Sequence, residues 1–185
     1  MKKKEIRKRH ASPVKRKKGR VTDDTLVSEA MLRTAVSKIL RRIKLDRTYD
    51  IPYLAGYSRN GKIIYIDRHL PKSFVTRGRR VFVDQYLILH ETVEKALLDE
   101  LGLHYQHAHQ IALRAEEAGV RASRISWRDY DRFMQKYIKV VGDEKLLRIP
   151  PELDIKPYHD EHDTKILVSM QKVVCRELAA RRRRK

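Results

Sequence analysis

The sequence has a single cysteine and no long run of apolar residues. With only Cys175, the chain cannot form an intramolecular disulfide or a cysteine-rich zinc site, and such cysteine usage is typical of a reducing compartment. No stretch approaches the roughly 20 apolar residues of a membrane-spanning helix, and no apolar signal-peptide core follows the basic start. These absences predict a soluble, cytoplasmic protein that makes no contact with a membrane.

Acidic residues are scarce relative to basic ones. The chain has 43 Lys and Arg against 24 Asp and Glu, which gives a formal net charge of +19 and a sequence pI near 10.2. General solubility needs far less charge than this. The surface is therefore expected to attract polyanions, in a way that depends on salt and does not select a base sequence.

The positive charge is concentrated at both ends of the chain. Residues 2–20 contain eleven Lys or Arg, one acid, and no apolar periodicity, so this stretch is expected to be disordered on its own. Residues 181–185 are four arginines and a lysine. We interpret 1–22 as a nucleic-acid-binding arm and 181–185 as a second basic tail. The expected contact residues are Lys2, Lys3, Lys4, Arg7, Lys8, Arg9, Lys15, Arg16, Lys17, Lys18 and Arg20.

A single α+β domain, mainly helical, is expected between these tails over residues 23–180. Two β-rich runs, 51–57 and 62–67, flank an Asn-Gly turn and predict a β-hairpin. Residues 46–50 are interpreted as a connection and 74–83 as a mobile basic loop. Apolar residues at helical spacing predict five helices, over about 24–44, 86–101, 103–120, 126–141 and from 163 onward.

The helix expected over 86–101 carries two ionisable side chains on its apolar face. Apolar residues recur at three- and four-residue intervals, and His90 and Glu94 lie on the same stripe. Burying an imidazole and a carboxylate one turn apart costs on the order of several kcal/mol unless each finds a partner or a cation. The stripe therefore calls for a metal ion or for polar partners.

The spacing of these residues suits a metal ion. In a His-Glu-x-x-His helix, the two histidines bind one ion and the Glu polarises a bound water. Here residues 90–94 read His-Glu-Thr-Val-Glu, and the second carboxylate can take the place of the second histidine as a ligand. The following helix has small residues along its inner line, together with His109 and Glu116. A tight antiparallel pair would bring His90, Glu94, His109 and Glu116 to one place.

These residues resemble the core of a zincin-like metallopeptidase, in a His-Glu-x-x-Glu variant, and are also similar to small prophage-type proteins of bacteria. The resemblance covers roughly residues 63–119. It implies a divalent metal, zinc or manganese, held by His90, Glu94 and His109, with Glu116 as an alternate or supporting residue. It implies Glu91 as general base in a metal-dependent hydrolase.

The resemblance also implies a peptide substrate, held in extended form by the strand at 62–67. It places the protein in the cytoplasm of a bacterial host cell, associated with nucleic acid or with a virion.

A different interpretation needs no metal. The buried side chains can satisfy one another across the two helices, His90 with Glu116 or Glu94 with His109. The chain would then be a non-catalytic, nucleic-acid-associated or phage structural protein with a degenerate zincin-like core. A second cluster of His and acids, at 158–163, could also hold a metal but is more typical of helix capping.

Overall fold

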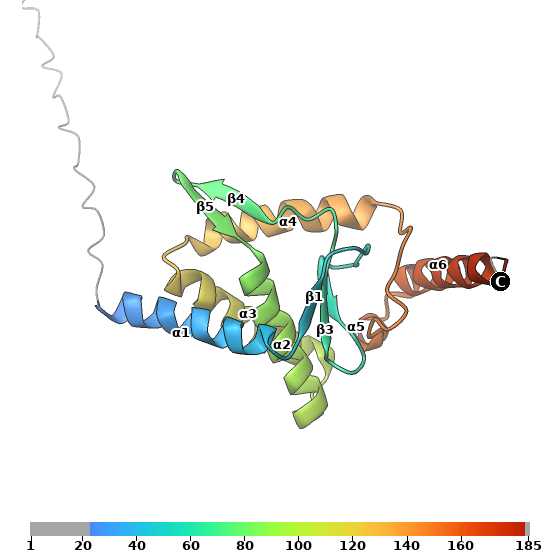
Figure 1. The fold of residues 1–185 in the computed structure, drawn as a ribbon, viewed down its shortest axis with the longest axis horizontal. Coiled ribbons are helices and arrows are strands. Elements are labelled where there is room, and N and C mark those ends of the chain that lie inside the picture. Colours follow the sequence, from blue (N-terminus) through green and yellow to red (C-terminus); the bar gives the residue numbers. More distant parts are fainter. Residues whose placement is uncertain (1–22, 184–185) are drawn as a thin grey trace, which may run out of the picture.

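The computed structural model describes residues 23–183 (Figure 1). The predicted arm and all eleven of its proposed nucleic-acid contacts lie outside these residues, as do the last two residues of the predicted tail. The described elements are α1 (Asp23–Leu40), β1 (Lys44–Asp46), β2 (Ala55–Tyr57), β3 (Ile63–Ile66), β4 (Ser73–Thr76), β5 (Arg79–Phe82), α2 (Asp84–Leu101), α3 (Tyr105–Ala122), α4 (Trp127–Asp143), α5 (Lys156–Asp160) and α6 (Thr164–Arg182). The class is α+β and mainly helical, as predicted.

The helices α2 and α3 form the predicted close antiparallel pair. The first helix ends at Gly102, whose φ of 61° is the left-handed conformation that closes many helices. The chain then turns back, so that the end of α3 lies beside the start of α2. At Gly119 an added Cβ would lie 3.2 Å from Leu89 Cδ2 and 3.6 Å from Tyr86 Cδ1. A side chain at Gly119 would therefore require Leu89 to shift, which shows how closely the two helices pack at this point.

The predicted hairpin is confirmed as β2 and β3, and it belongs to a three-stranded sheet. The strand order is β1-β3-β2, with β3 antiparallel to β2 and parallel to β1. The strand β1 was not predicted, because residues 41–45 continue the helical pattern of α1. Pairing with the free edge of β3 overrides that local pattern, and α1 ends at Leu40.

The prediction of a mobile basic loop over residues 74–83 was wrong. These residues form the antiparallel hairpin β4–β5, which turns at Arg77 and Gly78, with φ angles of 50° and 75°. Two consecutive positive φ angles are typical of a tight hairpin turn. The arginines concealed the strand pattern, in which Val81 is buried and Phe74 packs against Phe133 of α4.

The remaining helices complete three apolar clusters. The largest lies among α1, α2, α3, α4 and the hairpins, and a second is formed by Ile51, Tyr65, Ile149, Leu153, Tyr158, Met170 and Val173 near α5 and α6. A small third cluster joins β2, α2 and α3 through Tyr57, Leu98, Tyr105 and Ala108. The Ser126 hydroxyl accepts a hydrogen bond from the Asp129 amide and caps α4. Likewise, Asp163 Oδ1 accepts from the Ile166 amide at the start of α6, 3.0 Å away. Within the cluster at 158–163, Asp163 thus makes the capping contact that this interpretation predicts.

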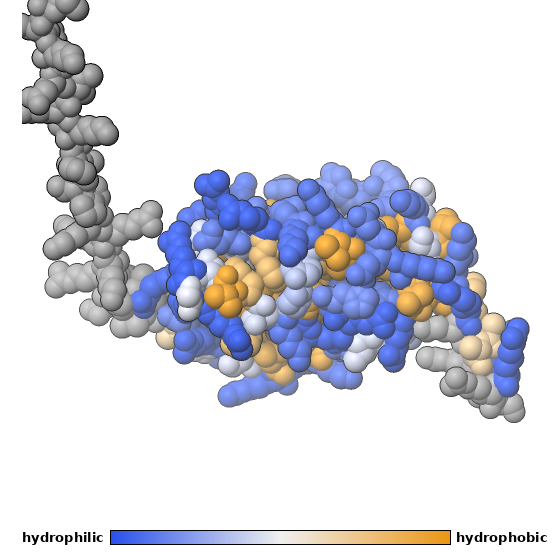
Figure 2. Space-filling model, turned by 90° about the horizontal axis from the view of Figure 1, so that it is seen from above, coloured by the Kyte–Doolittle hydropathy of each residue, from blue (hydrophilic) through white to orange (hydrophobic). Residues whose placement is uncertain are grey.

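The outer surface reflects the composition of the chain. Figure 2 shows a face on which hydrophilic residues predominate and apolar residues form small separate groups. Among residues 23–183, no helix combines the length and the apolar character needed to cross a membrane.

Candidate metal centre

Three predicted ligands meet between α2 and α3. His90 and Glu94 lie one turn apart on α2, and His109 comes from the first half of α3. His90 Nε2 lies 3.2 Å from His109 Nδ1 and 3.4 Å from Glu94 Oε2. His109 Nδ1 lies 2.9 Å from the same Glu94 oxygen. These three side chains form a group that could hold a metal ion.

The spacing of the three atoms suits a tetrahedral ion. Zinc binds nitrogen and carboxylate oxygen at about 2.0–2.2 Å, so neighbouring ligand atoms around it are separated by about 3.3–3.5 Å. The observed separations of 2.9, 3.2 and 3.4 Å are close to this value. Two imidazoles and one carboxylate are also a common ligand set of catalytic zinc. The residues present therefore fit a divalent metal.

Glu116 supports His90 from the opposite side of the imidazole ring. His90 Nδ1 lies 2.8 Å from Glu116 Oε2, and the Tyr130 hydroxyl donates to Glu116 Oε1 at 2.5 Å. A carboxylate on one ring nitrogen fixes the tautomer and directs the lone pair of the other nitrogen toward a metal. Of the two roles predicted for Glu116, the geometry favours support of a ligand.

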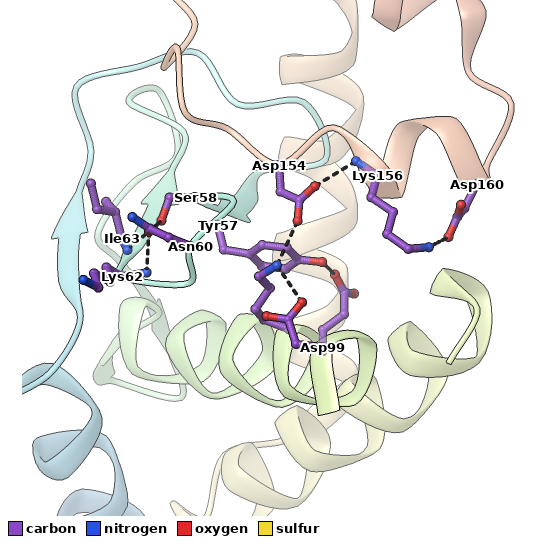
Figure 3. A network of polar contacts seen from close by, with 11 residues as sticks. Tyr57, Ser58, Asn60, Lys62, Ile63, Asp99, Asp154, Lys156 and Asp160 are labelled. Carbon is purple, nitrogen blue, oxygen red and sulfur yellow. Dashed lines mark hydrogen bonds and ion pairs between the residues drawn. The ribbon is translucent and has the colours of Figure 1, made fainter. Parts of the chain in front are cut away.

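A second tyrosine positions Glu94. The Tyr57 hydroxyl, from β2, donates to Glu94 Oε1 at 3.0 Å, which leaves Oε2 to face the two histidines. Lys95 Nζ lies 5.2 Å from the centroid of the Tyr57 ring and pairs with Asp99 at 2.8 Å and Asp154 at 3.0 Å. Figure 3 shows this network crossing from the sheet to α2 and on to the segment before α5.

Burial and neighbouring charges change the pKa values of this cluster. Burial alone would lower the pKa of His90, but the hydrogen bonds to Glu116 and Glu94 outweigh it and raise the pKa to about 10. Burial alone would raise the pKa of Glu94, but hydrogen bonds with His109 and His90 lower it overall. Without a metal, protons on both facing ring nitrogens would satisfy Glu94 Oε2. A metal ion would replace these protons.

Glu91 differs from the other acids because its carboxylate has no hydrogen-bond partner within the described part of the chain. It is only 7% exposed, and burial followed by the charge of Glu94 raises its pKa to about 8. It lines a cavity of about 180 Å³ together with His90, Glu94 and His109. This volume has room for several water molecules. The predicted base therefore lies in the same cavity as the predicted ligands.

The comparisons with known proteins gave no match to a protein family, a curated protein or a solved structure. The zincin-like fold expected from the sequence is therefore not confirmed by a known structure. The description of the site therefore depends only on the residues of this chain and their geometry.

Sequence reasoning missed the two tyrosines that organise the site. Tyr130 belongs to the helix predicted over 126–141 and is fully buried, and its hydroxyl holds Glu116. Tyr57 was assigned only to the hairpin. The hydroxyl of a buried tyrosine usually needs a hydrogen-bond partner. A tyrosine rather than a phenylalanine at these apolar positions was therefore the signal in the sequence that pointed to a polar contact.

Several other histidines lie away from the cluster. His159 and His162 are exposed, and within residues 23–183 the group at His90 is the only one with geometry for a metal. His69 is also exposed and contacts Glu144 at the end of α4.

Protein purified without a metal-binding tag should contain about one equivalent of zinc or manganese, measured by mass spectrometry. His90→Ala and His109→Ala each remove a ligand and should abolish it. Glu116→Gln should weaken metal affinity by about 10- to 100-fold, because the support of His90 is lost.

His107→Ala is the matched control, since His107 is exposed on the same helix as His109. The metal content of this control should equal that of the unmodified protein. Equal metal content in His109→Ala would contradict the site.

Proposed function

We propose that this chain is a metal-dependent hydrolase, with peptides as its substrates. The observation that carries the proposal is the unpartnered Glu91 carboxylate in a cavity shared with a His-Glu-His ligand set. The ion would be held by His90 Nε2, His109 Nδ1 and Glu94 Oε2. This set of ligands favours zinc and, after zinc, manganese. A divalent ion in such a site lowers the pKa of bound water and polarises a carbonyl group.

The protein residues then have separate tasks. Glu91 accepts the proton of the attacking water and returns it to the leaving group, first as a general base and then as a general acid. Glu116 and Tyr130 hold the imidazole of His90, and Tyr57 holds the carboxylate of Glu94. These supporting contacts fix the ligand side chains before substrate arrives, which reduces the reorganisation needed for the reaction.

The sheet supports a peptide substrate, although through a different strand from the one expected. β3 is central, with β1 on one side and β2 on the other, so it cannot accept a further strand. β1 and β2 are the edge strands, and of the two only β2 lines the cavity. The Leu54 carbonyl accepts from the Asp67 amide, and the Ser58 amide donates to the Ile63 carbonyl. The alternation of an antiparallel ladder therefore directs the peptide groups of Ala55 and Tyr57 away from β3.

The Tyr57 carbonyl already accepts from the Asp154 amide. The peptide group of Ala55 therefore supplies the position at which an extended substrate would pair.

Glu91→Gln should reduce hydrolysis of a fluorogenic peptide library by about 100-fold or more, because an amide cannot take the proton. Metal content should be unchanged, since Glu91 is not a ligand in the proposed site. Glu100→Gln, at an exposed position of the same helix, should retain full activity. Undiminished hydrolysis by the Glu91 variant would rule out its role as the base.

We also propose that the chain binds nucleic acid through its basic arm. The charge supports this: residues 2–20 carry eleven of the 43 Lys and Arg of the whole sequence. Such an arm attracts a phosphate backbone without reading its sequence. Binding and hydrolysis are compatible, because an arm of this kind can localise an enzyme on nucleic acid.

Deletion of residues 2–20 should weaken binding to a labelled DNA duplex and reduce the slope of log affinity against log salt, because fewer counterions are released. Fluorescence anisotropy at several salt concentrations measures both quantities. An affinity that does not depend on salt concentration, or that is unchanged by the deletion, would contradict this proposal.

A further inference from the structure

A second cavity lies where several arginines converge. It has a volume of about 200 Å³ and is lined by residues of α1, β5, the start of α2 and the connection between α3 and α4. Its charged residues are Glu29, Arg33, Arg79 and Arg80. Figure 1 shows the start of α1, the hairpin β4–β5 and the α3–α4 connection on the same side of the molecule. This cavity does not include the candidate metal ligands.

The charges of this cavity do not balance. Glu29 makes one close ion pair, with Arg33 at 2.8 Å. The guanidinium groups of Arg79 and Arg124 each lie 3.9 Å from the Glu29 carboxylate, which is beyond hydrogen-bonding distance. Within the cavity, the single carboxylate of Glu29 thus faces the guanidinium groups of Arg33 and Arg79, and Arg80 adds a third. The excess positive charge leaves guanidinium donors for an additional anion.

The Tyr86 hydroxyl gives a second, independent indication of a ligand. Tyr86 is fully buried and lines the same cavity, and its hydroxyl oxygen has no hydrogen-bond partner among the described residues. A buried hydroxyl without a partner is costly and uncommon. A ligand atom that accepts this hydrogen bond would remove the cost.

We propose that this cavity binds a phosphate group of a nucleic-acid backbone. Arginine donates to phosphate oxygens in a planar, bidentate manner, and a tyrosine hydroxyl can donate to a third oxygen. Arg79 is already oriented, because one of its Nη atoms donates to the Ser123 carbonyl at 2.9 Å. The other Nη atom faces Glu29 and remains available for the phosphate.

The position of the cavity favours nucleic acid as the source of this phosphate. The basic stretch 2–20 leads into α1 at Asp23, and Glu29 follows six residues later. At a rise of 1.5 Å per residue, this separation is about 9 Å. The cavity therefore lies within about 9 Å, along α1, of the point where the basic stretch joins the described structure. The identification of nucleic acid as the ligand rests on the nucleic-acid binding proposed above. It requires neither a metal nor Glu91.

The test is binding of a labelled DNA duplex to the full chain, measured by fluorescence anisotropy at several salt concentrations. The double variant Arg79→Ala/Arg80→Ala should weaken binding at least about tenfold and make the salt dependence shallower. The matched control is Arg114→Ala/Arg176→Ala, which removes the same charge from exposed positions on α3 and α6. Equal losses in the two double variants would overturn the cavity site.

Tyr86→Phe separates binding from folding. The hydroxyl has no hydrogen-bond partner within residues 23–183, so this variant should retain the melting temperature of the unmodified chain while its affinity for DNA falls several-fold. An unchanged affinity would contradict the role of Tyr86.

Inorganic phosphate should compete weakly for the cavity. Strong competition by millimolar phosphate would identify a free phosphate as the ligand and overturn the nucleic-acid source.

The arm-deleted protein distinguishes the two nucleic-acid proposals. If deletion of residues 2–20 abolishes binding while the cavity variants match their control, the arm binds nucleic acid and the cavity does not. If the cavity variants weaken the residual binding of the arm-deleted protein, both sites contribute.

Discussion

Several ionisable side chains are buried between α2 and α3, where they are largely shielded from bulk water. The surrounding fold supplies the hydrogen-bond partners that these side chains need. His90, Glu94 and Glu116 are each at most 5% exposed. A buried charge must be paired, hydrogen-bonded or bound to a cation. The close approach at Gly119 brings the two helices near enough for His109 and Glu116 to reach His90 and Glu94. The close packing of α2 and α3 is therefore what allows the cluster to form.

Elements far apart in the sequence meet this requirement. β2 supplies Tyr57 and α4 supplies Tyr130, and each hydroxyl holds one carboxylate of the cluster. Lys95, over the Tyr57 ring, connects α2 to the segment before α5 through Asp154. The unpartnered Glu91 is the exception to this pattern. A buried acid left without a partner, beside groups that are all satisfied, is typical of a residue kept for chemistry.

The sequence predicted the parts of this arrangement that depend on local periodicity. His90 and Glu94 share a stripe with apolar residues, so their burial and convergence on one point followed from helical spacing. The role of Glu116 did not follow, because the rotation of one helix against another decides which ring nitrogen a carboxylate reaches. β1 and the hairpin β4–β5 were missed for a related reason. Pairing with β3 and the packing of Phe74 on Phe133 stabilise strands in segments whose charges favour helix or loop.

The most direct test of the metal centre is anomalous diffraction from crystals of the protein loaded with zinc. The ligand geometry predicts a single strong peak between α2 and α3, at about 2.0–2.2 Å from His90 Nε2, His109 Nδ1 and a Glu94 oxygen. Glu116 should remain on His90 Nδ1, and a nonprotein ligand should face Glu91. Zinc bound elsewhere, with the histidines and Glu94 still bonded directly to one another, would contradict a metal centre and leave a structural polar cluster.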